Sequence, residues 1–156
     1  TVTGQKILPG NWEDMIFWSI MDIYYGSTFI ITKPLENYHI TQIIRKTVKD
    51  TSLVNKFLLS YFEKNETYLN EFEINSIENI LESASLFVEK SESVRFGSYV
   101  VSGTTQLLTS YAKDYGVEIA RKRLEEMWIN SIVAAGKDSI IIDRGAVDYF
   151  TGSILK

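Results

Sequence analysis

The stretch from Asn11 to Gly26 constrains the fold more than any other part of the chain, because it begins and ends like a helix and is apolar on nearly every side. Asn11 is a favoured N-cap residue, and Gly26 can take the left-handed conformation that often ends a helix. A surface helix needs only one apolar stripe. Residues 12–25 therefore predict a central helix, covered on two sides by its own domain or by a partner.

Helical spacing of apolar residues recurs along the rest of the chain. It covers residues 37–50, 53–62, 74–88 and 117–135, with Ser52 as the expected cap of the second of these helices. Two short β-branched runs, 28–32 and 139–143, are typical of strands. The sequence therefore predicts a mainly α fold with five to seven helices packed around the central helix at about 12–25. An α+β fold, with a small sheet from 28–32 and 139–143, is the alternative.

Residues 93–103 fit two structures. A strand is indicated by the alternation of Val94, Phe96, Ser98 and Val100. A second set, at helical spacing and including Gly97, would form a seam that another helix could approach closely. We expect a helix that continues through Lys113.

Length and composition are those of one globular domain. The chain has 156 residues, of which 45% are hydrophobic and 23% charged. We expect a flexible lead-in at 1–10 and a single domain at 11–156. Residues 63–92 are acidic, which favours a solvated helix face over a docking surface for a basic partner. The net charge of −4 argues against nucleic acid as a partner.

Cysteine is absent, so disulfides, thiolate metal sites and a cysteine nucleophile are excluded. The chain also lacks an apolar run long enough to span a membrane. Together these features favour a cytoplasmic protein without a membrane partner.

The common catalytic and cofactor motifs are missing. His39 is the single histidine, and one histidine without cysteine cannot make the usual zinc site. A heme held by His39 alone is disfavoured. Neither a nucleophile elbow nor a phosphate-binding glycine loop occurs. We therefore predict no catalytic residues, no metal and no cofactor.

Two weaker patterns remain. Asp143 and Asp148 flank Arg144 after an expected strand, where carboxylate and arginine chemistry could support an enzyme or toxin-like effector. Residues 112–117 resemble the turn of a helix-turn-helix motif. However, Lys122 and Glu125 occupy positions where that motif needs apolar residues, so DNA binding is disfavoured.

The absence of catalytic motifs predicts a non-enzymatic regulatory, sensory or protein-interaction domain. We expect it to self-associate as a homodimer or to bind a protein partner, through apolar surface on the central helix and on residues 117–131. The enzyme or toxin-like effector is the alternative. A small apolar ligand could also bind in an aromatic pocket; its expected residues are Trp12, Trp18, Tyr24, Tyr25 and Trp128.

Overall fold

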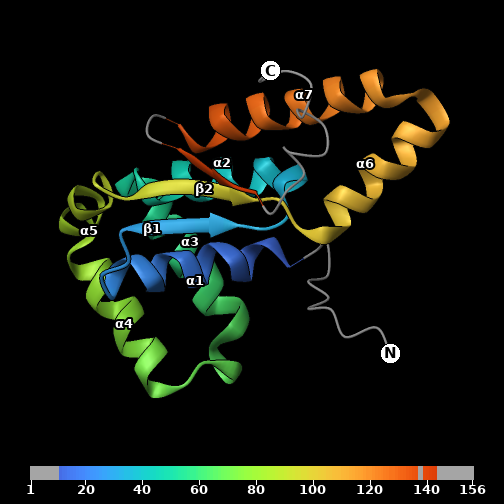
Figure 1. Ribbon diagram of the computed structural model, residues 1–156. Helices are drawn as coiled ribbons and strands as arrows, with labels where there is room; N and C mark the ends of the chain where they lie inside the picture. Colours follow the sequence, from blue (N-terminus) through green and yellow to red (C-terminus); the bar gives the residue numbers. More distant parts are fainter. Residues whose placement is uncertain (1–10, 137–138, 144–156) are drawn as a thin grey trace. The chain divides into compact units, whose positions relative to one another are not determined.

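The computed structural model describes residues 11–136 and 139–143. Within these ranges the chain forms seven α-helices, two short 3-10 helices and one three-stranded parallel sheet (Figure 1). The predicted mainly α class is confirmed, and the small sheet of the α+β alternative is present. In the same ranges, no helix has both the length and the apolar character needed to cross a bilayer. The expected lead-in at 1–10 lies outside the described residues.

The chain divides into two compact units. Unit 1 comprises Thr1–Ser27 and Lys46–Ser93, and unit 2 comprises Thr28–Arg45 and Val94–Lys156. Helix α2, Tyr38–Val48, has residues in both. A single globular domain at 11–156 stays a prediction, and each unit is described by itself.

Unit 1 contains only helices among its described residues. They are α1 (Trp12–Tyr24), the end of α2, α3 (Thr51–Asn65), the 3-10 turn η2 (Glu66–Tyr68), α4 (Glu71–Glu82) and α5 (Ala84–Ser91). Two of these helices carry side-chain caps, which satisfy first-turn N–H groups that have no partner within the helix. The Asp50 carboxylate accepts from the Leu53 N–H, and Asn70 and Glu73 form a reciprocal capping box. Local sequence therefore fixes where α3 and α4 begin.

Two details predicted for unit 1 are wrong. Asp50, not Ser52, caps α3. The single helix expected over 74–88 is two helices, because the chain breaks at Ser83, whose hydroxyl donates to the Asn79 carbonyl at 2.7 Å. Serine competes for helix carbonyls in this way, so apolar spacing alone misses the break.

Helix α1 buries most of its circumference. Its fully or nearly fully buried apolar residues are Ile16, Phe17, Ile20, Met21 and Ile23. Trp18 is 51% exposed and Trp12 41% exposed, so the tryptophans lie outside the buried arc. Coverage of α1 is broad, as its composition requires, but it leaves a strip that includes Trp18 and Asp22 open to solvent.

Unit 2 is built on the parallel sheet. Strand β2 (Arg95–Tyr99) lies between β1 (Phe29–Thr32) and β3 (Ile140–Ile142). Ile30 pairs with Phe96, and Ser98 pairs with Ile141. The other elements of the unit are the 3-10 turn η1 (Leu35–Asn37), the first part of α2, α6 (Ser102–Tyr115) and α7 (Val117–Ala135).

The helix expected through residues 93–103 is wrong, because this segment supplies the central strand. Phe96 and Ser98 are both buried, and strands pair on each side of β2. A Cβ built on Gly97 would collide with the Ile140 carbonyl oxygen and lie 2.9 Å from a Phe29 ring carbon. Gly97 therefore allows the neighbouring strands to approach β2 closely. In the predicted helix, the same glycine would have allowed the close approach of a second helix.

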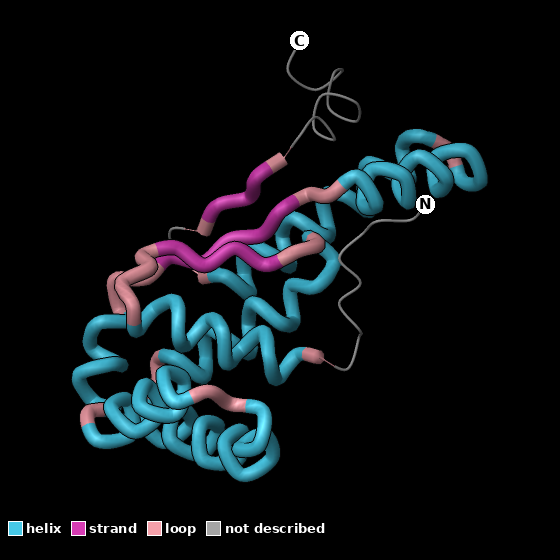
Figure 2. The backbone as a smooth tube through the Cα atoms, turned by 90° about the horizontal axis from the view of Figure 1, so that it is seen from below, coloured by secondary structure: helices cyan, strands magenta, loops and turns pink. Residues whose placement is uncertain are grey.

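The core of unit 2 joins the sheet ends to α6 and α7. Its buried members are Leu35, Val100, Leu108, Ala120, Leu124 and Met127. Helices α6 and α7 form a hairpin that leads away from the carboxyl end of β2 and returns to the sheet (Figures 1 and 2). Gly116, at a φ of 93°, makes the turn between them. We call these two helices the α6–α7 hairpin.

Candidate functional site

The inner side of the α6–α7 hairpin is an apolar seam. Leu108 of α6 is fully buried, as are Ala120 and Leu124 of α7. The apolar spacing of residues 117–135 predicts one buried face, and Ala120, Leu124 and Met127 form it. Val117 is the exception at 60% exposed, because it directly follows the turn at Gly116.

Opposite this seam, α7 presents a second row of side chains to solvent. The row consists of Ile119, Lys122, Glu126, Ile129 and Val133, and we call it the α7 stripe. Its members are three or four residues apart, so they lie on one face of the helix. Ile119 is 48% exposed, Ile129 62% and Val133 66%. A helix that already buries one face in its own unit thus carries a second apolar row.

Charged side chains interrupt and flank the α7 stripe. The Arg123 guanidinium donates to Glu126 at 3.0 Å, and Arg121 donates to Glu118 at 2.5 Å. These pairs are exposed and join residues three apart, so each stabilises the helix only weakly. They add little to the stability of unit 2, but they set the charge pattern of the outer face.

Hydrogen bonds from the sheet and from α2 hold the C-terminal half of α7. Ser131 Oγ donates to Ser98 Oγ at 2.6 Å, and both serines are buried. Arg45 Nε donates to the Ala134 carbonyl at 2.8 Å, where a cation suits the end of a helix dipole. Gly136 ends α7 as predicted, at a φ of 85°, and a Cβ there would lie 2.7 Å from an Arg45 nitrogen. The outer face is therefore presented on a firmly anchored helix.

The five aromatic residues expected to bind a ligand are spread over both units. Tyr24 and Tyr25 pack edge to face, with ring centroids 4.9 Å apart. Trp18 meets the buried Phe17 edge to face at 5.2 Å, and Trp12 begins α1. Within unit 1 these residues follow one another along α1 and its C-cap, Tyr25.

Tyr25 is also held by α4. Its ring stacks on Phe72, its hydroxyl bonds to Ser76, and 53% of the residue is exposed. Trp128 belongs to unit 2, where it packs against the core of that unit. The Trp128 Nε1–H is buried without an acceptor among the described residues. The aromatic ligand pocket stays a prediction.

Polar groups gather at the carboxyl edge of the sheet in unit 2. Lys33 lies 5.1 Å from the centroid of the Tyr99 ring, and Thr104 donates to Glu36 at 2.7 Å. Asp143 directly follows β3, whose last residue, Ile142, accepts from the Val100 N–H. Ligands of open parallel sheets bind at this edge. Arg144 and Asp148, the predicted companions of Asp143, lie outside the described residues.

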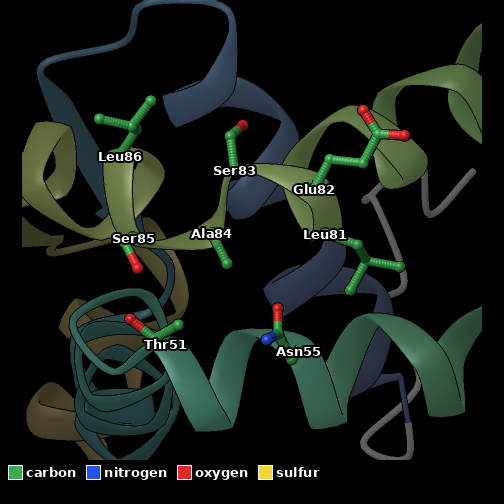
Figure 3. Close-up of a pocket in the computed structure, with 8 residues that line it drawn as sticks. All are labelled: Thr51, Asn55, Leu81, Glu82, Ser83, Ala84, Ser85 and Leu86. Carbon is green, nitrogen blue, oxygen red and sulfur yellow. The ribbon is translucent and has the colours of Figure 1, made fainter.

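In unit 1, a hollow of about 340 Å³ lies among α3, α4 and α5 (Figure 3). Thr51, Asn55, Leu81, Glu82, Ser83, Ala84, Ser85 and Leu86 line it. Figure 3 shows Asn55 reaching from α3 toward Ala84 and Leu81. Asn55 Oδ1 is buried and has no donor among the described residues. The hollow contains none of the five predicted ligand residues, and its lining has no aromatic ring.

Comparison with known proteins gives no relative. No family model, no curated protein and no solved structure matches the chain.

One buried phenol shows how unit 1 is held together. The Tyr61 hydroxyl donates to Asp14 Oδ1 at 2.7 Å, and its ring stacks on Phe17 with centroids 4.2 Å apart. Burial raises the pKa of Tyr61 well above its ordinary value, and the hydrogen bond to the Asp14 carboxylate raises it further. The group thus stays protonated and serves as a structural donor between α1 and α3.

Within residues 11–136 and 139–143, no three histidine or acidic side chains are grouped closely enough to hold a metal ion. The α7 stripe was not predicted, because the prediction for residues 117–135 concerned only the inner face of the helix. The available signal was the three-four spacing of the whole row, Ile119, Lys122, Glu126, Ile129 and Val133.

Proposed function

We propose that this chain is a non-enzymatic interaction module, regulatory or sensory in role, that binds a protein partner through the α7 stripe. One observation carries the proposal. Ile119, Ile129 and Val133 are each about half or more exposed on a single face of α7, although the opposite face already packs in the core of unit 2.

Single exposed apolar side chains are normal on protein surfaces and need no function. A row of them on one helix face is different, because anchors at helical spacing are how helices bind partners. The row also contains Lys122 and Glu126, which would let a partner be selected by charge. This combination of apolar and charged residues favours specific binding with a defined geometry over non-specific hydrophobic association.

A site-specific cross-linking experiment tests the proposal. A photoreactive amino acid is placed at Ile129, or at Ser110 of α6 as the control, since both positions are exposed and lie in the same hairpin. We expect illumination of cells that make the protein to give an adduct of one discrete mass from position 129 and none from position 110. Equal cross-linking from both positions, or none from 129, would count against an interaction role for this face.

A second candidate function is an enzyme or effector that uses the carboxyl edge of the sheet. The gathering of Lys33, Glu36 and Asp143 in unit 2 favours this edge over other surfaces for carboxylate chemistry. However, Glu36 already accepts from Thr104 at the start of α6, where a carboxylate suits the helix dipole. Part of the edge thus has a structural role, which leaves fewer groups for catalysis there.

The two candidates separate by mutation. Asp143→Asn removes a carboxylate charge at the sheet edge and leaves the α7 stripe intact. If the second candidate is right, the variant loses the protein's cellular effect while cross-linking from position 129 persists. Under the interaction proposal, Ile119→Asp, at an exposed position of the α7 stripe, should abolish both the cross-link from position 129 and the cellular effect.

A further inference from the structure

The α7 stripe has an internal symmetry of charge and apolarity. Ile119 and Ile129 lie five residues before and after Leu124, and Lys122 and Glu126 lie two residues before and after it. If the helix is paired with an antiparallel copy of itself about this midpoint, each isoleucine meets an isoleucine and each lysine meets a glutamate. Such self-complementarity is what a two-fold symmetric interface requires, because residue i contacts j while j contacts i.

We propose that the partner of the α7 stripe is a second copy of this chain, bound antiparallel with its two-fold axis at the level of Leu124. This inference rests on the proposed function and adds the identity and register of the partner. The three-four spacing of the stripe is the spacing of a coiled-coil seam. It gives two apolar layers of Ile119 with Ile129, and two charged layers of Lys122 with Glu126.

Other arrangements of the same two helices are less favourable. A parallel pair in register places Lys122 on Lys122 and Glu126 on Glu126, so both charged layers would be repulsive. An antiparallel pair displaced by half a heptad sets Lys122 against Val133 and Glu126 against Ile129. Of these arrangements, only the register about Leu124 pairs all four of Ile119, Lys122, Glu126 and Ile129 with one another.

The ends of the seam fit the same register. Helix α7 has 19 residues, which span about 28 Å at 1.5 Å per residue. Val133 of one copy would lie opposite the hairpin turn of the other, where Tyr115 is 59% and Val117 60% exposed. Glu126 already accepts from Arg123 of its own helix at 3.0 Å, but a carboxylate has lone pairs for a further donor from the partner.

Charge reversal tests the partner. The purified full chain is studied by sedimentation as wild type, Lys122→Glu, Glu126→Lys and an equimolar mixture of the two variants. We expect the wild type to dimerise and each variant alone to dimerise at least tenfold more weakly. The mixture should recover wild-type affinity, because in both charged layers a glutamate of one variant then meets a lysine of the other. Both positions are exposed, so circular dichroism should be unchanged.

Cysteine cross-linking tests the register. The chain has no cysteine of its own, so introduced thiols are the only ones present. Under mild oxidation, a mixture of Ile119→Cys and Ile129→Cys chains should form disulfide-linked dimers, whereas each chain alone should form at least tenfold less. Efficient linking of Ile119→Cys to itself would mean parallel helices and would overturn the inference.

These experiments distinguish failure of the dimer from failure of the interaction role of the α7 stripe. A wild-type chain that stays monomeric at high concentration overturns the second copy as partner. If position 129 nevertheless gives a discrete adduct with another protein, the interaction module survives. A dimer unaffected by charge reversal places the self-association elsewhere on the chain, and equally overturns the inference.

Discussion

The two units specify their elements in different ways. In unit 1, two helix starts are fixed by side-chain caps from adjacent residues, Asp50 for α3 and the Asn70–Glu73 box for α4, whereas α1 and α5 have no such cap. In unit 2, α6 begins after Val101 and α7 after Gly116, both without a side-chain cap. The strands of unit 2 depend on pairing between residues far apart in the chain, since 65 residues separate Thr32 from Gly97. Side-chain caps thus fix two of the helix starts in unit 1, whereas the sheet of unit 2 depends on long-range contact.

The largest expected effect of a single change in unit 1 is at the Phe17 ring. Phe17 is fully buried and stacks on Tyr61, so Phe17→Ala should lower the free energy of unfolding by about 4 kcal/mol. Trp18→Ala is the matched control, because its larger ring is half exposed, and about 1 kcal/mol or less is expected. Urea denaturation measures both. Equal losses of unfolding free energy in the two variants would show that the burial of a ring on α1 does not determine how much it stabilises unit 1.

Gly97 is the corresponding weak point of unit 2. Gly97→Ala puts a Cβ against the Ile140 carbonyl oxygen and should cost about 3 kcal/mol by forcing the strands apart. Gly103→Ala is the control, since the nearest atom to its Cβ would be 3.9 Å away. The same denaturation experiment measures both. If the units unfold separately, Gly97→Ala and Phe17→Ala should shift different transitions; a shared shift would contradict the division.

The Tyr61 hydroxyl should give a smaller effect that depends on pH. Tyr61→Phe removes the donor to Asp14 and should cost about 1.5 kcal/mol at neutral pH. The pKa of Tyr61 is raised in the folded state above the ordinary 10.0. The stabilisation is therefore fully present below pH 10 and is lost as the pH rises further, because the unfolded phenol ionises first.

Stability curves of wild type and Tyr61→Phe between pH 7 and 11 check this expectation. The other tyrosines titrate in both proteins, so the difference between the curves isolates Tyr61. If the difference in unfolding free energy between the two proteins stays constant above pH 10, the Tyr61 hydroxyl does not couple α1 to α3.

The smallest expected effect concerns the cap of α4. Asn70→Ala removes the acceptor of the Glu73 N–H and should cost about 1 kcal/mol. Asn75→Ala, at an exposed position inside the same helix, should be neutral or slightly stabilising because alanine is the better helix former. Thermal unfolding distinguishes them. If the stability of Asn70→Ala equals that of the wild type, the side-chain cap does not stabilise α4, and the capped and uncapped helices do not differ in this respect.

This contrast also explains what the sequence could predict. The helix over 117–135 was predicted to within a residue, because apolar spacing and Gly136 mark it locally. The strand at Arg95–Tyr99 was predicted as a helix, because its environment is made by β1 and β3, which no local pattern reveals. The exposure of Trp18 and the outer row of α7 were missed for a similar reason. Composition tells how apolar a helix is, but tertiary packing decides which of its faces are covered.

The insertion of Lys46–Ser93 between the first two strands has a consequence for synthesis. As the ribosome makes the chain, β1 emerges long before β2. Until β2 is synthesised, the backbone donors and acceptors of β1 have no strand to pair with. At ordinary elongation rates of about 5–20 residues per second, that delay lasts several seconds. The intervening helices, rich in local contacts, can form during this time. A nascent chain halted soon after Ser93 should thus have helical structure but a first strand exposed to misassociation with its neighbours.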